Sequence, residues 1–182
     1  MIEIVAYTDG SAVVKGKSKG NGGFGTYFPD FYGERLAFSL GFEETKTGRM
    51  EISALFYAIR AFKHDHKEDV LLRVYSDSQY VVKTFTENRL NKWIRNNWKN
   101  PSGDIKNRDM WEAIILALKN RPFLRLEMNH IRSHQIEKAK TQKEKDSLML
   151  NENIQGNRVA DFLADYKRHK ELLTKDKLKD YE

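Results

Sequence analysis

The chain has 182 residues, with 32 Lys or Arg against 26 Asp or Glu for a formal net charge of +6, and it contains no cysteine. This length fits one domain, and 40% hydrophobic with 32% charged residues is a globular composition. The missing cysteine excludes a disulfide scaffold, cysteine-ligated zinc and thiol catalysis, and no apolar run reaches the length of a membrane span. With no secretory signal pattern, we expect a reducing, cytoplasmic compartment. The positive charge is a weak indication of a polyanionic partner.

The first 45 residues predict three strands. Residues 1–7 form a nearly continuous apolar run with β-branched side chains, which is typical of a strand buried on both faces. The stretch 15–23 is glycine-rich and basic, which predicts a loop. Strands at residues 24–28 and 35–40 are then expected on either side of a turn at Pro29-Asp30, so the three strands would form a meander.

From Glu51 onward the apolar residues recur with the period of an amphipathic helix. The recurring residues are Ile52, Leu55, Phe56, Ile59 and Phe62. Glu51 is expected in the first turn of this helix. Residues 70–75 predict another buried strand, which stops at Ser76-Asp77-Ser78, where Ser or Asp can cap a following helix. Because a crossover helix connects the two strands, they should be parallel neighbours.

The second half of the chain predicts two helices around one strand. A helix is expected from Asp109 to Lys119, a strand from Phe123 to Met128, and a closing helix from Asn157 to Lys170. The closing helix should turn inward Val159, Phe162, Leu163 and Tyr166.

The distribution of charge along the chain predicts the domain organisation. Residues 137–146 hold seven charged residues in ten without an apolar period, which predicts a mobile loop. We expect one domain over residues 1–170, with a basic protrusion at 88–108 and an extended charged loop at 135–155. The tail at 171–182 is expected to fray.

Two aspartates follow the ends of the expected parallel strands. Ligands of open α/β sheets bind outside the carboxyl ends of the strands, so Asp9 and Asp77 should meet at one edge, with Glu51 joining from the helix between them. Taken singly, an Asp after a strand is a turn former or N-cap, and a Glu in a first helical turn serves the helix dipole. Together the three would raise one another's pKa values, a cost that hard divalent cations relieve. Oxygen ligands alone select Mg²⁺ or Mn²⁺ over zinc.

Five segments resemble, in order, the motifs of type 1 ribonuclease H. They are Tyr7-Thr8-Asp9-Gly10-Ser11, Gly48-Arg49-Met50-Glu51, Tyr75-Ser76-Asp77-Ser78-Gln79-Tyr80, Ile131-Arg132-Ser133-His134 and Gly156-Asn157-Arg158-Val159-Ala160-Asp161. The resemblance spans residues 2–168. It implies an α/β, ribonuclease H-like fold, in which a mixed five-stranded sheet, a three-strand antiparallel meander plus parallel strands, is flanked by helices. It also implies an endonuclease that hydrolyses the RNA strand of RNA/DNA hybrids and leaves 5′-phosphate and 3′-hydroxyl ends.

The resemblance implies a metal site as well. Its carboxylates would be Asp9, Glu51, Asp77 and Asp161, and two Mg²⁺ ions, with Mn²⁺ as a substitute, would promote an in-line phosphodiester displacement. In this interpretation Asp9 bridges both ions and Asp161 holds the nucleophile-side ion. Glu51 and Asp77 help to hold the leaving-group ion. Spacing alone does not find Asp161, which is expected in the first turns of the last helix and is otherwise an ordinary surface residue.

Two histidines lie near the end of the last expected strand. His134 matches the family's mobile-loop histidine, whose implied catalytic role is proton handling or product release. Histidine suits that role because its ordinary pKa lies near neutrality. The alternative for His134 is a solvated side chain in a polar segment. His130 falls in the strand, where we expect a packing residue.

Several further residues match family positions that contact the hybrid. Gln79 resembles a residue that contacts the RNA strand near the minor groove, where the 2′-hydroxyl is recognised. Gly10 and Ser11 belong to the first motif, and as part of it they are expected to bind substrate. Asn107 matches a residue that holds a DNA-strand phosphate, and Lys46 stands where the family has a Thr partner.

Residues 92–99 interleave aromatic and cationic side chains. Trp93, Trp98 and Lys99 are therefore candidate contacts for a nucleic-acid strand. The alternative is that both tryptophans are core residues of a short helix whose Lys and Arg side chains are solvated.

Two other functions stay open. One is a different nuclease of the same fold, such as a 3′-5′ exonuclease, although that pattern requires an acidic residue where Ser11 stands. The other is a hybrid-binding module without catalysis. The sequence argues against it, because all four acidic positions of the family are filled. The expected partner is an RNA/DNA hybrid, with no membrane, and the protein is expected to be a monomer. Because the first strand starts at Met1, we expect no hybrid-binding domain ahead of it.

Overall fold

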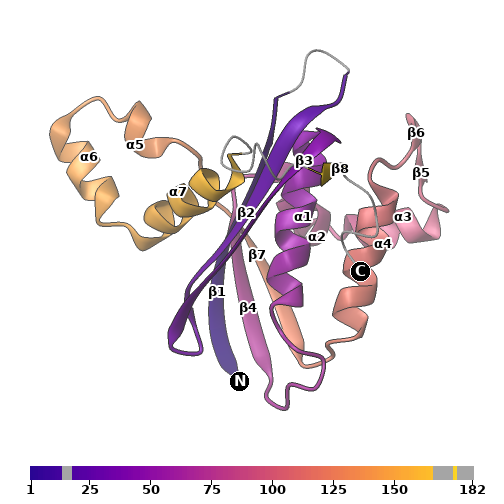
Figure 1. Ribbon diagram of the computed structural model, residues 1–182. Helices are drawn as coiled ribbons and strands as arrows, with labels where there is room; N and C mark the ends of the chain where they lie inside the picture. Colours follow the sequence, from indigo (N-terminus) through magenta and orange to yellow (C-terminus); the bar gives the residue numbers. More distant parts are fainter. Residues whose placement is uncertain (14–17, 166–173, 176–182) are drawn as a thin grey trace.

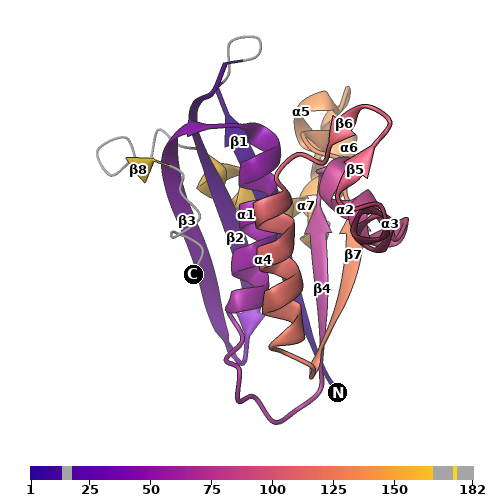
Figure 2. The same cartoon turned by 90° about the vertical axis from the view of Figure 1, so that its right-hand side faces the viewer.

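The computed structural model describes residues 1–13, 18–165 and 174–175. In chain order its elements are β1 (Ile2–Ala12), β2 (Gly20–Phe31), β3 (Glu34–Thr45), α1 (Thr47–Arg60), β4 (Val70–Ser76), α2 (Gln79–Thr86), α3 (Arg89–Arg95), β5 (Lys99–Asn100), β6 (Gly103–Asp104), α4 (Arg108–Lys119), β7 (Leu124–His130), α5 (Gln135–Lys138), α6 (Gln142–Met149), α7 (Glu152–Ala164) and β8 (Thr174–Lys175). The helices α1 and α4 cover one face of the main sheet, and α7 lies on the other (Figures 1 and 2). None of the described helices is long and apolar enough to cross a membrane.

Within the described residues, six strands form the main sheet in the order β7-β4-β1-β2-β3-β8. β1, β2 and β3 make an antiparallel meander, whereas β1, β4 and β7 run parallel to one another. The expected five-stranded mixed sheet is therefore confirmed. The short strand β8 extends it by pairing parallel to β3, within the tail that was expected to fray. The rest of that tail, residues 171–173 and 176–182, lies outside the described residues.

The predicted apolar stripe packs α1 onto the sheet. Ile52, Leu55 and Ile59 are completely buried, and Phe56 and Phe62 are nearly so. This burial confirms the helical period that the sequence showed. The helix begins at Thr47, four residues before Glu51, so its first turn contains no acidic residue.

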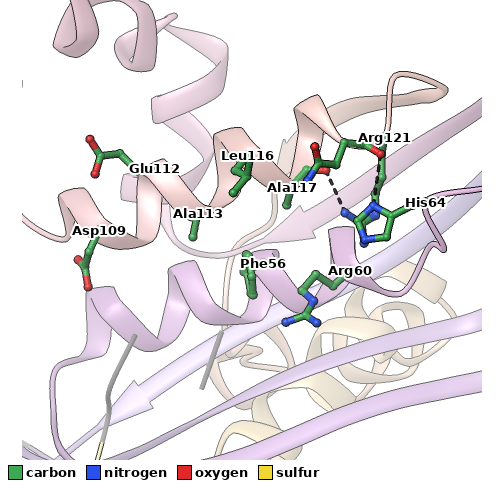
Figure 3. Close-up of a pocket in the computed structure, with 10 residues that line it drawn as sticks. Phe56, Arg60, His64, Asp109, Glu112, Ala113, Leu116, Ala117 and Arg121 are labelled. Carbon is green, nitrogen blue, oxygen red and sulfur yellow. Dashed lines mark hydrogen bonds between the residues drawn. The ribbon is translucent and has the colours of Figure 1, made fainter. Parts of the chain in front are cut away.

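The helices α1 and α4 pack side by side and leave a groove between them (Figure 3). The groove encloses about 490 Å³, and Phe56 and Leu116 are among the residues that line it. At one end the buried Arg121 donates Nε–H to the carbonyl oxygen of Phe62 at 2.7 Å and Nη1–H to that of Ala117 at 3.0 Å. Arg121 therefore ties the two helices together, and none of the four expected carboxylates lines this groove.

The turn between β2 and β3 lies at Tyr32-Gly33, and the prediction of a turn at Pro29-Asp30 is wrong. Tyr32 and Gly33 have φ angles of 56° and 90°, as the two central residues of a tight hairpin require. The carboxylate of Asp30 accepts the backbone N–H of Gly33 at 2.7 Å, which fixes the turn. Pro29 remains in β2, at a register shift between Phe28 and Phe31 where a missing N–H is tolerated.

The charged segment at 135–155 is helical, so the prediction of a mobile loop over residues 137–146 is wrong. It contains α5, α6 and the start of α7. The hydroxyl of Thr141 accepts the N–H of Glu144 at 3.2 Å, and the carboxylate of Glu144 accepts the N–H of Thr141 at 3.1 Å. This capping box starts α6 without an apolar stripe. Apolar periodicity therefore could not predict α6, which projects from the body of the protein (Figure 1).

The closing helix starts earlier than expected. It begins at Glu152, and the side chain of Asn151 caps it by accepting the N–H groups of Asn153 and Ile154 at 3.0 and 3.2 Å. Phe162, expected to face inward, is 57% exposed. Tyr166, also expected to face inward, lies outside the described residues.

A close approach between α7 and β2 generates a testable prediction. A Cβ at Gly25 would overlap the carbonyl oxygen of Ala160 and lie 2.5 Å from the Cβ of Leu163. We expect Gly25→Ala to lower the free energy of unfolding by about 1 to 3 kcal/mol, because it overpacks this contact. Urea denaturation at unchanged m-value measures the change.

The matched control for Gly25→Ala is Gly48→Ala in α1. A Cβ there would lie 3.7 Å from the ring of Tyr80, which is ordinary contact. Alanine is favoured over glycine within a helix, so this variant should gain about 0.5 to 1 kcal/mol. Equal stability of the two variants would contradict the packing described for α7.

Candidate active site

The register of β1 and β4 brings two aspartates together. Tyr7 pairs with Tyr75 across the two parallel strands, and their rings stack at 5.5 Å between centroids. Side chains two residues apart in a strand share a face. Asp9 and Asp77 each lie two residues further on, so they stand side by side at the carboxyl ends of neighbouring strands, as predicted.

The helix α7 brings Asp161 to the same face. Asp9 pairs with Gly25 in the meander, and the backbone of Ala160 lies directly over Gly25. The hydroxyl of Ser11 donates to the carbonyl oxygen of Ala164 at 2.8 Å and holds the end of the helix against β1. Asp161 is therefore placed beside Asp9. It is the tenth residue of the 13-residue helix, and the prediction that it lies in the first turns is wrong.

Glu51 reaches the site from the helix on the other face of the sheet. A Cβ at Gly10 would overlap the backbone nitrogen of Glu51, so only glycine lets β1 approach α1 this closely. Glu51 is half-buried and lies just beyond the first turn of α1. A role as a first-turn partner of the helix dipole therefore does not explain it.

Burial and mutual repulsion raise the pKa values of these carboxyl groups. Burial raises the pKa of Asp9 well above its usual range, and the charges of Asp77 and Asp161 add to this, with a smaller contribution from Glu51. The N–H of Gly10 donates to Asp9 Oδ1 at 2.6 Å and partly offsets the shift. For Asp77, burial and then Asp161 raise the pKa. Burial also raises the pKa of Glu51, with a smaller effect of Asp77.

The donor set suits a hard divalent cation. All four side chains are carboxylates, which are the ligands that such a cation prefers. Their like charges raise one another's pKa values, and a bound cation would relieve this repulsion. In the described part of the chain, no three His, Asp or Glu side chains are already gathered as metal ligands. The carboxylates are therefore close enough to influence one another's pKa values without forming a closed ligand cluster among the described residues.

His134 lies beside Asp77 at the start of α5. It is exposed, has a φ angle of 52°, and its charge lowers the pKa of Asp77. Its role at this site stays a prediction. His130 is exposed at the end of β7, so the prediction that it packs in the core is wrong. It lines a small groove together with Gln79 and Lys83.

Three of the predicted substrate contacts lie at the starts of helices. Gln79 is the exposed first residue of α2, Lys46 precedes α1, and Asn107 precedes α4. The starts of α1 and α4 adjoin, because a Cβ at Gly48 would lie 3.9 Å from Nδ2 of Asn107. An ion pair between Arg49 and Asp109 at 2.8 Å joins the two helices.

Four other predicted substrate contacts differ in their accessibility. Trp98 is only 8% exposed, its ring packs 6.4 Å from that of Trp93, and the guanidinium of Arg108 lies 5.4 Å above it. The alternative of a core tryptophan therefore describes Trp98. Trp93 is half-buried and Lys99 in β5 is exposed. Gly10 is buried against α1, so among these four only Trp93 and Lys99 present surface for a strand.

Two serines that support the carboxylates were not predicted. The hydroxyl of Ser78 hydrogen-bonds to Glu51, and that of Ser133 hydrogen-bonds to Asp77, and each bond lowers the pKa of its partner. Both serines sit next to a predicted site residue in the sequence, Ser78 after Asp77 and Ser133 before His134. That adjacency is a signal, but the sequence does not show which carboxylate each serine reaches.

The comparisons with known proteins agree with this geometry. The RNase H family model matches residues 2–168. A ribonuclease H from Syntrophomonas wolfei is 40% identical over 124 residues, which cover 66% of this chain and 80% of that protein. A ribonuclease H from Lachnoclostridium phytofermentans is 36% identical over 125 residues, covering 66% and 75%.

Solved structures share the fold. The crystal structure of LC9-RNase H1, a type 1 RNase H, has a TM-score of 0.64 at 21% identity, covering 90% of this chain and 70% of that one. The solution structure of the PFV RNase H domain has a TM-score of 0.62 at 24% identity, covering 93% and 95%. LC11-RNase H1, solved in complex with RNA/DNA hybrid, has a TM-score of 0.58 at 21% identity, covering 89% and 94%.

The raised pKa of Asp9 generates a stability prediction for the metal-free protein. Because its folded-state pKa exceeds the unfolded value, the protein gains stability as the pH falls through that pKa and loses it as the pH rises. Asp9→Asn removes the charge and keeps an oxygen for the N–H of Gly10. We expect it to be more stable than wild type at neutral pH by about 1 to 3 kcal/mol, with the difference vanishing in acid. Urea denaturation in a chelator measures this.

The control for that measurement is Asp65→Asn. Asp65 is exposed and lies in the α1–β4 connection, outside the site, so its substitution should leave stability unchanged at every pH. An Asp9→Asn variant that is less stable than wild type at neutral pH would show that the carboxylates do not repel one another.

Proposed function

The chain belongs to the ribonuclease H family, and we propose that it is an endonuclease that hydrolyses the RNA strand of RNA/DNA hybrids. The observation that carries the proposal is the convergence of Asp9, Asp77 and Asp161 on one sheet edge, with Glu51 beside them. The relatives' names give the activity, and LC11-RNase H1 was solved with such a hybrid. We also propose that the protein acts as a monomer in the cytoplasm.

Metal binding belongs to this proposal. Asp9, Glu51, Asp77 and Asp161 would hold two Mg²⁺ ions, or Mn²⁺ in their place, with Asp9 shared between them. Bound at this edge, the ions would supply activation of the attacking water and stabilisation of the leaving oxygen, which gives 5′-phosphate and 3′-hydroxyl products. Glu51 and Asp77 would serve the leaving-group side and Asp161 the nucleophile side.

The chain's own groups prepare this site. The N–H of Gly10 fixes the orientation of the Asp9 carboxylate, and the hydroxyls of Ser78 and Ser133 keep Glu51 and Asp77 toward their charged forms. His134, exposed beside Asp77, would carry a proton between the reacting phosphate and solvent or assist product release.

Recognition of the hybrid is assigned to surfaces on either side of the carboxylates. Gln79 would contact the RNA strand, where the 2′-hydroxyl distinguishes RNA from DNA. Lys46 and Asn107, at the adjoining starts of α1 and α4, would hold a phosphate of the DNA strand. Lys99, on the β5–β6 ribbon, would follow the backbone by charge.

Cleavage of a labelled RNA/DNA hybrid in Mg²⁺ tests the proposal. Wild type should cut internally within the RNA strand and leave double-stranded DNA intact. Asp9→Asn and Asp77→Asn should each lose on the order of 10³-fold or more in kcat/KM, because metal-bound stabilisation of the transition state is worth several kcal/mol. Asp65→Asn should cut as wild type does.

The same assay separates the alternatives. Stepwise removal of nucleotides from the 3′ end of single-stranded DNA would indicate an exonuclease of the same fold. Tight binding of the hybrid without cleavage in either metal would indicate a binding module. Equal activity of wild type and the two aspartate variants would reject the carboxylate site itself.

A further inference from the structure

We propose that the helical arm formed by residues 135–150, which contains α5 and α6, is a second contact for the phosphate backbone of the hybrid. The arm would grip the duplex on the side of the carboxylates opposite to the protrusion formed by α3, β5 and β6. This inference rests on the proposed function, because it takes the same duplex as its ligand. It adds a substrate-holding surface that the motifs do not contain.

The position of the arm supports this assignment. It begins directly after His134, which lies beside Asp77, and its packing within the described residues is chiefly against α7, the helix that carries Asp161. Figure 1 shows the arm and the α3–β5–β6 protrusion on opposite sides of the sheet. Figure 2, turned by 90°, shows both at the same end of the sheet. A duplex laid across the carboxylates between them would meet both projections.

The arm carries more lysines than acidic residues. Residues 135–150 contain four lysines and three acidic residues. Each acidic side chain is already engaged within the protein: Glu144 accepts backbone N–H groups of the capping box, Asp146 accepts from Gln142 at 2.8 Å, and Glu137 pairs with Arg158 at 3.9 Å.

The lysines of the arm have no such partners. Among the residues that the structure describes, Lys138, Lys140, Lys143 and Lys145 form no ion pair, and the ammonium of Lys138 only donates to the carbonyl oxygen of Ser133 at 3.4 Å. Lys138, Lys140 and Lys143 are exposed. The arm thus has a small net positive charge and offers unpaired lysines to a phosphate backbone.

The arm is connected physically to the catalytic edge. A groove of about 560 Å³ lies between them, and its charged lining residues are Glu137, Arg158, Asp161 and Asp165. The ion pair of Arg158 with Glu137 links the arm to α7 one turn before Asp161. The amide of Gln135 donates to the carbonyl oxygen of Arg132 at 2.8 Å and secures the start of α5.

A protein partner is the competing occupant of this surface. The end of α6 and the residue after it, Met149 and Leu150, are 52% and 85% exposed. These two side chains lie together at the end of α6, whereas the unpaired lysines are spread along the arm from α5 to α6. Charge and continuity with the site therefore favour the duplex.

Equilibrium binding of a labelled hybrid in EDTA tests the proposal without cleavage. The arm variant combines Lys138→Gln, Lys140→Gln and Lys143→Gln. We expect its Kd to rise by roughly tenfold, since exposed charge pairs contribute up to about 1 kcal/mol each. The slope of log Kd against log salt should fall by about 0.9 for each phosphate that the arm no longer neutralises.

The control variant removes the same charge elsewhere. It combines Lys63→Gln, Lys67→Gln and Lys119→Gln, which are exposed at the opposite end of the sheet from the carboxylates. It should bind the hybrid as wild type does. An arm variant that binds as tightly as wild type, or a control variant that weakens binding equally, overturns the proposal. The first of these results would leave Met149 and Leu150 as a surface for a protein partner.

Site-specific crosslinking gives an independent readout. The chain has no cysteine, so Lys143→Cys carries a single thiol for a photoreactive label. The labelled arm should crosslink to the hybrid, whereas Lys63→Cys with the same label should not. Absence of a crosslink from the arm contradicts the proposal. Failure of wild type to cleave the hybrid would instead reject the proposed function, so the two failures are distinguishable.

Discussion

The parallel pairing of β1 with β4 forces Asp9 and Asp77 onto one face at neighbouring strand ends, where both lose water and gain a like-charged neighbour. Neither strand can avoid this by slipping, because a shift of one residue would turn each buried side chain to the other face. Asp161 then adds a third charge to the same place. The packed sheet therefore holds mutually repelling carboxylates together, and a divalent cation bound there would relieve the repulsion.

Three close backbone approaches make this arrangement possible. Gly10 lets α1 approach β1, Gly25 lets α7 approach β2, and a Cβ at Gly156 would overlap the ring of Tyr7. Each glycine stands where a side chain would push a carboxylate-bearing helix away from the sheet that carries Asp9. The apolar core of α1 and the bond of Ser11 to α7 supply the stability that offsets the repulsion. A single added Cβ at one of these glycines would therefore disturb both the packing and the positions of the carboxylates.

Much of the fold and of the candidate site could be predicted from the sequence, because the burial of a strand or a helix face leaves a local pattern of apolar residues. Buried runs indicated β1 and β4, the helical stripe indicated α1, and the order of motifs indicated the fold and the four carboxylates. The segment around α6 could not be found in this way, because a capping box at Thr141 rather than an apolar face stabilises it. The sequence could not show whether Trp98 is buried or exposed, since a short run of aromatic and cationic residues is found both in cores and on surfaces. The hydrogen bonds of Ser78 and Ser133 depend on tertiary distances that no spacing encodes.

The central claim is that the carboxylates hold cations because burial and repulsion have raised their affinity for protons. Calorimetric titration with Mn²⁺ at several pH values, in two buffers of different ionisation enthalpy and with hybrid present, tests it most directly. Binding requires deprotonated ligands, so wild type should release protons on binding, and its affinity should rise as the pH increases through the raised pKa of Asp9. Absence of binding, or binding without proton release at any pH, would contradict the account.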